Sequence, residues 1–175
     1  SASPGRVASQ TWPSGVKVNY QYTARGWLNT VTLGTAVTVN PLPATPGGTP
    51  GSSASLPVGT ALWTASAVNA WGKSEQHAYS NGINNRAVFD AQSGRLVKLT
   101  AGAGTTSNVV DQRYAWDSVN LLVQRIDALG EGSGVQVLDS FLYDKLGRLA
   151  SYTVSGGSPG NPVSRAVSLQ YNALG

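Results

Sequence analysis

One short motif recurs along this chain of 175 residues, and its recurrence limits the fold more than any other feature of the sequence. Each copy begins with a stretch in which apolar and polar residues alternate. A polar residue follows it, and a glycine or asparagine comes three or four residues later. Most copies end with a second alternating stretch. The six copies span residues 20–28, 65–74, 88–96, 114–122, 141–149 and 169–175. Such self-similarity is typical of an array of one supersecondary unit, so the fold is predicted to be a repeat array.

The polar residue of each copy fits the start of a tight turn. Asp, Asn and Thr side chains there accept hydrogen bonds from backbone N–H groups two residues further on. The column holds Thr23, Asn69, Asp90, Asp117, Asp144 and Asn172. Because amides and a hydroxyl share it with the acids, turn capping explains the column better than paired carboxylates for acid–base catalysis.

The later residue of each copy fits a left-handed backbone, which glycine adopts freely and asparagine tolerates well. The column holds Gly26, Gly72, Gly94, Asn120, Gly147 and Gly175. A type I turn followed by a left-handed residue joins two strands and introduces a G1 bulge. Each copy is therefore predicted to be a β-hairpin.

The flanking stretches alternate as half-buried strands do, most clearly over residues 16–22 and 167–171. Turn-to-turn spacings of 46, 22, 26, 27 and 28 residues leave room for one hairpin each. The residue before each polar position is bulky and mostly aromatic: Tyr22, Val68, Phe89, Trp116, Tyr143 and Tyr171. The predicted fold is all-β with almost no helix, an array of antiparallel hairpins with an aromatic column on one face.

Two stretches fall outside this pattern. Residues 1–15 contain no copy and stay unassigned, so the hairpin array is expected over 16–175. Residues 40–59 are rich in Pro, Gly and Ser and lack alternation, which predicts a flexible loop inserted into one repeat. A linker between two domains is the alternative, and the repeats on both sides of the stretch favour the insertion.

The best copy resembles the signature of a known family. Tyr143, Asp144, Gly147, Arg148 and Leu149 follow the order Y-D-x-x-G-R-L, which is similar to the YD-repeat, or Rhs-repeat, family. Other copies keep less of the signature: Phe89, Asp90, Gly94, Arg95 and Leu96, then Trp116, Asp117, Asn120 and Leu122. Together the copies extend the resemblance over about residues 16–175.

The resemblance implies an architecture and a role. In bacterial Rhs proteins, in the C components of insecticidal toxin complexes and in teneurins, such repeats form a long curved sheet that spirals into a hollow shell. In the bacterial cases the shell encloses a toxic C-terminal polypeptide. The resemblance therefore implies a non-enzymatic, secreted or cell-surface segment, whose partners are the remainder of the same shell and the enclosed polypeptide.

The family also suggests what the chain lacks. Members that release cargo cut themselves at an aspartate site opening with Asp-Pro, a pair absent from this sequence. Six hairpins are too few to close a shell, and the chain starts at Ser1 without methionine, so it is expected to be cut from a longer spiral. Strand edges left open by such cuts predict self-association.

The composition argues against several other functions. Without cysteine, the chain can form no disulfide, zinc–thiolate site or cysteine nucleophile. The net charge is +4, but its basic residues are scattered, so nucleic-acid binding is not expected. The sequence contains no apolar run of about 20 residues, which is the length needed to span a membrane. No cofactor or metal is expected either, because one carboxylate per repeat is too few for calcium.

A few residues leave room for other functions. His77 is the only histidine, but it lies in an expected strand and no G-x-S-x-G elbow occurs, so a solvent-facing residue is predicted. Arg95 and Arg148, with Lys73, are expected to be solvated edge charges, or else a row that contacts anionic glycans or a partner. Trp27 and Trp71 lie at turns, where packing is favoured. As glycan contacts they would support an alternative function, a carbohydrate-binding or cell-surface adhesion module.

Overall fold

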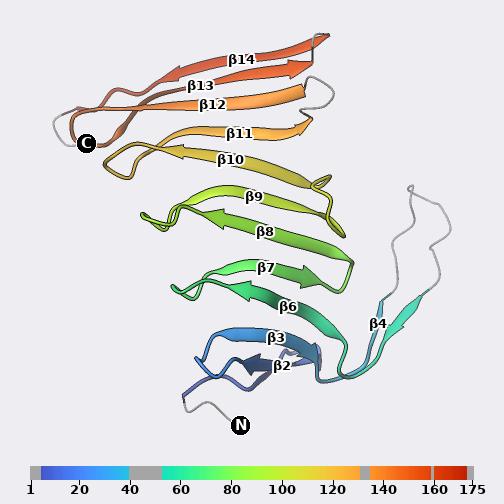
Figure 1. The fold of residues 1–175 in the computed structure, drawn as a ribbon. Helices are drawn as coiled ribbons and strands as arrows, with labels where there is room; N and C mark the ends of the chain where they lie inside the picture. The colour runs from blue at the N-terminus through green and yellow to red at the C-terminus, as the bar shows by residue number, and fades with distance from the viewer. Residues whose placement is uncertain (1–4, 40–52, 131–134, 159, 173–175) are drawn as a thin grey trace. The chain divides into compact units, whose positions relative to one another are not determined.

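The computed structural model describes residues 5–39, 53–130, 135–158 and 160–172 (Figure 1). Every regular element in these ranges is a β-strand, and none of them is a helix. The all-β prediction is therefore confirmed. The chain divides into two compact units, Ser1–Ile83 and Asn84–Gly175, which are described one after the other.

The first unit is an antiparallel meander with one side hairpin. Its sheet has the order β1-β2-β3-β6-β7. The bounds are β1 (Ser9–Thr11), β2 (Lys17–Tyr22), β3 (Leu28–Leu33), β6 (Ala61–Val68) and β7 (Ser74–Tyr79). Between β3 and β6, the strands β4 (Val37–Val39) and β5 (Ala54–Leu56) form a separate two-stranded sheet.

The second unit continues the same design with longer strands. Its strands run in the sheet order β8 to β14. The bounds are β8 (Ile83–Phe89), β9 (Leu96–Ala103), β10 (Val110–Trp116), β11 (Leu122–Gly130), β12 (Val135–Tyr143), β13 (Leu149–Ser158) and β14 (Asn161–Ser168). From β9 to β14 each strand pairs antiparallel with the next, and Figure 1 shows these hairpins side by side.

Each hairpin turn has the geometry that the glycine column requires. The backbone φ is 82° at Gly26, 77° at Gly72, 66° at Gly94 and 75° at Gly147. Asn120, at 75°, is the only non-glycine residue with positive φ among the described residues. The strand register shifts beside these turns, for example between Leu142 and Tyr143, as a bulge demands.

Two strands lie where the sequence indicated none. β1 falls within the unassigned residues 1–15, and β5 falls within the expected loop 40–59. Each has three residues, which is too short for period-two alternation to be recognised. Residues 40–52 of the insertion lie outside the described residues, as does Gly175 of the last copy.

Each unit is a single layer with little buried core. Val18 is the largest fully buried side chain, and the other buried apolar residues are Leu33, Ala65, Ala101 and Ala128. A domain of two packed layers buries many leucine, isoleucine and phenylalanine side chains instead. In the part of the chain that the structure describes, the aromatic side chains of the strands thus stay half-exposed.

The second unit also carries a charged pair within the sheet. Arg125 and Asp139 lie opposite each other on β11 and β12, and Arg125 Nη2 is 2.6 Å from Asp139 Oδ2. The Asp139 side chain is only 11% exposed. The Arg125 side chain is 48% exposed, so only the carboxylate is buried. Because a shift in register would leave that buried carboxylate without its cation, the pair disfavours such a shift.

The turn edge as the candidate functional site

The signature copy shows how the polar column works. Asp144 Oδ1 accepts the backbone N–H groups of Leu146 at 2.8 Å and of Arg148 at 2.9 Å, and Arg148 Nε donates to Oδ2 at 2.7 Å. These bonds hold the pKa of Asp144 below its usual value, with the backbone N–H of Arg148 as the largest cause. A carboxylate with both oxygens engaged in this way acts as a turn cap.

The other copies repeat the cap with different chemistry. Asp117 Oδ1 accepts N–H groups at 2.8 and 2.9 Å, and Asn69 Oδ1 accepts two at 3.0 and 3.1 Å. The longer turn at Asp90 is closed by Ser93, whose hydroxyl and N–H both donate to the carboxylate and lower the Asp90 pKa. The cap of Thr23 is its hydroxyl, which accepts from the N–H of Trp27 at 3.1 Å.

The aromatic column joins three hairpins of the second unit, each to the hairpin before it. Trp116 Nε1 donates to the carbonyl of Leu96 at 2.8 Å, Tyr143 Oη to Leu122 at 2.8 Å and Tyr171 Oη to Leu149 at 2.7 Å. We call these the aromatic tip bonds. The backbone pairing of β11 with β12 begins only at Gln124. The carbonyl of Leu122 lies before that point, and the tip bond of Tyr143 supplies it with a hydrogen-bond donor from β12.

The two arginines of the G-R-L triplets reach in the opposite direction, to the following hairpin. Arg95 Nη1 donates to the carbonyl of Asp117 at 2.6 Å. The guanidinium of Arg148 lies over the ring of Tyr171, 4.3 Å from its centroid, within range for a cation–π interaction. These side chains link adjacent hairpins, and the Arg148 side chain is at the same time 37% exposed.

A further copy of the motif lies at the start of the chain, where the sequence analysis assigned nothing. Gly5 has φ 80°, Arg6 lies over the ring of Tyr22, and Tyr22 Oη donates to the carbonyl of Val7 at 3.0 Å. Arg148 and Leu149 make the same two contacts with Tyr171. The signal was present in the sequence, because G-R-V-A-S at 5–9 differs from G-R-L-A-S at 147–151 in one residue.

One more turn of the same backbone pattern joins β1 to β2. Trp12 N donates to the carbonyl of Val16, and Gly15 N donates to the carbonyl of Trp12, both at 2.9 Å. Pro13 occupies the position that its fixed φ favours in a type I turn. The turn lacks a capping side chain, and for that reason the polar column did not identify it.

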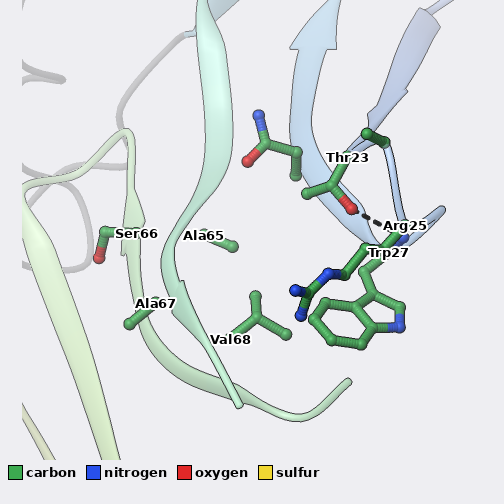
Figure 2. A pocket seen from close by; sticks show the side chains of 9 residues that line it. Thr23, Arg25, Trp27, Ala65, Ser66, Ala67 and Val68 are labelled. Carbon is green, nitrogen blue, oxygen red and sulfur yellow. Dashed lines mark hydrogen bonds between the residues drawn. The ribbon is translucent and has the colours of Figure 1, made fainter. Parts of the chain in front are cut away.

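Open depressions lie at the turn edge of both units, at equivalent places of the repeat. The first, of about 340 Å³, lies between the β2–β3 turn and the end of β6 and is drawn in Figure 2. Thr23, Arg25 and Trp27 form one side of it, and Ala65 to Val68 form the other. The second unit has one of about 470 Å³ beside Asp90, Arg95 and Trp116.

The candidate glycan contacts occupy different environments. Trp27 is half-buried, with the guanidinium of Arg25 5.6 Å from its ring centroid, and its Nε1 lies against Gly72 of the next turn. A Cβ at Gly72 would come within 2.9 Å of that nitrogen, so glycine is needed there for packing as well as for its φ. Trp71, at the apex of that turn, is 56% exposed.

His77 is half-buried rather than solvent-facing, which corrects the expectation from sequence. Its ring centroid lies 5.5 Å from that of Trp63 and 5.3 Å from that of Tyr79. Its Nδ1 is 3.2 Å from Ser74 Oγ, and burial lowers its pKa. The neighbouring strand β6 places Trp63 directly opposite Tyr79, and this pairing builds the cluster.

No three acidic or histidine side chains of the described residues gather closely enough to hold a metal ion. None of the segments described is a helix long and apolar enough to cross a membrane.

Comparisons with known proteins were informative at the level of structure alone. No protein-family model matches the chain, and no curated protein matches it by sequence. A crystal structure of TcdB2-TccC3-Cdc42 superposes on 86% of this chain with a TM-score of 0.61 and 16% identity. The chain has the fold of a segment of TcdB2-TccC3. A second crystal structure, TcdB2-TccC3-TEV, covers 94% of the chain with a TM-score of 0.51 and 14% identity.

The likeness to TcdB2-TccC3 concerns a small part of that protein. The chain matches only 6% and 9% of the two TcdB2-TccC3 chains. At such identities the match establishes the fold. This fold agrees with the YD-repeat resemblance that the sequence motif indicated. The hairpin array and the turn edge of this chain therefore belong to a known architecture.

Proposed function

We propose that this chain is a wall segment of a hollow YD-repeat shell, a non-enzymatic part of a longer secreted or cell-surface protein. In that protein the shell encloses a toxic C-terminal polypeptide. The observation that carries the proposal is the double linkage at the turn edge, where aromatic tip bonds reach back one hairpin and arginines reach forward one hairpin. This linkage fixes neighbouring hairpins to each other beyond their backbone ladder.

The single layer of each unit supports the same role. A sheet with half-exposed aromatic faces does not bury enough surface to form an ordinary two-layer domain. It can form a wall, because each hairpin of a repeat array is stabilised by its neighbours along the array. The partners of this segment are then the hairpins before and after it and the enclosed polypeptide.

Protease protection tests the proposal. The longest natural protein that contains these residues would be purified and treated with a broad-specificity protease, before and after mild urea. Encapsulation predicts that the C-terminal polypeptide survives until urea opens the shell. If that polypeptide is degraded at once while the repeats stay intact, the repeats do not enclose it.

A second candidate function is glycan binding, favoured by the depression in Figure 2. Trp27 offers a ring, and Arg25 places a cation over that ring, 5.6 Å from its centroid. A sugar could stack on the other ring face or contact the cation. A glycan array tests it, with Trp27→Ala and Arg25→Ala as variants and Trp12→Ala, outside the depression, as the control. Binding that all three variants retain would contradict this role.

A further inference from the structure

The turn edge of the first unit gathers basic side chains that the sequence keeps apart. The β2–β3 turn and the β6–β7 turn lie at the same edge of the sheet (Figure 1). Arg25 is exposed in the first of these turns, and Lys73 is exposed at the end of the second. Successive hairpins lie about 10 Å apart, twice the spacing of neighbouring strands, so folding makes near neighbours of these two cations.

A third cation belongs to the same edge. Arg6 is exposed, and its guanidinium lies 5.4 Å from the ring centroid of Tyr22. A Cβ at Gly26 would overlap this guanidinium. Arg6 is therefore held against the β2–β3 turn, and it extends the row formed by Arg25 and Lys73.

Few negative charges oppose this row. Residues 1–83 contain four basic side chains and a single acidic one, Glu75 on β7. The turn caps at this edge, Thr23 and Asn69, are neutral. The equivalent caps of the second unit are all acids: Asp90, Asp117 and Asp144. The turn edge of the first unit thus carries a net positive charge that its own caps do not compensate.

An aromatic side chain projects from the same edge. Trp71 occupies the apex of the β6–β7 turn and is 56% exposed, although an indole ring gains free energy by leaving water. The Asn69 cap accepts its backbone N–H at 3.1 Å, which fixes the apex. An exposed indole beside basic side chains is the combination found at membrane–water interfaces, where the ring lies among the lipid headgroups.

We propose that the turn edge of the first unit binds the surface of an anionic lipid bilayer. Trp71 enters the headgroup layer, and Arg6, Arg25 and Lys73 face the lipid phosphates and carboxylates. A projecting apex suits a flat, deformable surface, whereas a peptide or a single small ligand needs a groove. Each basic side chain near such a membrane strengthens binding roughly fivefold, so this small set gives weak, reversible attachment.

The proposal rests on this edge alone and depends neither on encapsulation nor on glycan binding. Lys73 and Trp71 do not line the depression in Figure 2. Variants at these two positions therefore separate a lipid surface from a sugar held in that depression.

Vesicle co-sedimentation of the full chain at low ionic strength tests the proposal. Vesicles of equimolar phosphatidylserine and phosphatidylcholine should bind the chain, and vesicles of phosphatidylcholine alone should not. Salt at about 1 M should release it, because the Debye length is then only about 3 Å. Brominated lipids quench tryptophan fluorescence on contact, and Trp71→Ala should remove that quenching.

Three charge variants locate the contact. Arg25→Gln and Lys73→Gln should each weaken vesicle binding roughly fivefold. Asn69→Asp should weaken it as well, because it gives this turn the acidic cap of the second unit without removing a cation or the indole. Circular dichroism checks that each variant keeps its strands.

Two matched controls lie in the second unit. Arg165→Gln on β14 removes the same charge as Lys73→Gln does. Leu146→Ala shortens an exposed apolar side chain at the turn position equivalent to Trp71. Both variants should bind vesicles as the unmodified chain does.

Three results would overturn the proposal. Phosphatidylserine vesicles could fail to bind the chain, which would leave the wall and glycan proposals intact. Arg165→Gln could weaken binding as much as Lys73→Gln, which would indicate an effect of net charge alone. Soluble polyglutamate or hyaluronate could bind more tightly than the vesicles and depend equally on Lys73, which would indicate an acidic polymer as the partner.

Discussion

Asn69 is the one cap in the described turns that carries a defect which substitution should repair. Its Oδ1 accepts the N–H groups of Trp71 and Lys73, but its Nδ2 is buried without a hydrogen-bond partner. At the equivalent place Asp144 has a second oxygen, which accepts from the Arg148 side chain. Asn69→Asp exchanges the unsatisfied donor for an acceptor while the two backbone bonds remain, and the Lys73 side chain, at the position of Arg148, is the donor expected to reach it.

The expected gain follows from the two changes. A buried donor without a partner costs about 1–3 kcal/mol, and hydrogen bonds to a charged acceptor are about twice as strong as neutral ones. The cost of partly burying the new charge offsets some of this. We therefore expect Asn69→Asp to raise the free energy of unfolding at pH 7 by about 1 kcal/mol, or Tm by about 2–4 °C for a chain of this size.

Urea unfolding followed by tryptophan fluorescence and circular dichroism measures the effect. The new carboxyl should have a depressed pKa in the folded state, as Asp144 has. Its stabilisation is then present above the unfolded pKa and is lost as the pH falls through the folded one. Asp144→Asn is the reverse control and should destabilise. If Asn69→Asp is no more stable than the unmodified chain at pH 7, this account of the cap is wrong.

Three further predictions concern the same edge. Tyr143→Phe removes one aromatic tip bond and should lower the free energy of unfolding by about 1 kcal/mol, and an unchanged urea midpoint would count against the linkage. Gly147→Ala, at φ 75°, should cost roughly 1–2 kcal/mol, whereas Asn120→Gly should not destabilise; equal thermal shifts for the two would contradict the left-handed assignment. Hydrogen bonds depress the pKa of Asp90 and Asp144 in the folded state. The stabilisation that these two caps contribute should therefore be full at neutral pH and be lost as the pH falls through their folded pKa values. Urea midpoints that stay constant from pH 7 to strong acid would refute this.

The turns were predictable from the sequence because each one is determined locally. A capping side chain, a left-handed glycine and alternating flanks lie within about ten residues, so Asp144 and Gly147 could be read as a hairpin directly. The single exception, Asn120, fits the same reasoning, since asparagine tolerates positive φ.

Contacts between hairpins were not predictable in the same way, because they join residues about 20 positions apart. The sequence indicated an aromatic column, but it could not show that Tyr143 donates to a carbonyl of the preceding hairpin. It also could not show that Arg95 reaches the following one. The half-burial of His77 similarly depends on which residues β6 places opposite β7.

The N-terminal copy was predictable, but the search for complete copies overlooked it. This half-copy lacks the polar cap and the strand that precedes the turn, so the column of turn residues cannot detect it. The match of residues 5–9 to 147–151 would have detected it, because those residues are the ones that contact the next aromatic side chain.

A cryo-electron microscopy map of the longest natural protein that contains these residues tests the central claim most directly. If the chain is a wall segment, its strands will pair on both edges with further hairpins, and one face will line an enclosed space that holds the C-terminal polypeptide. A map in which these residues project as an isolated sheet with solvent on both faces would contradict the account.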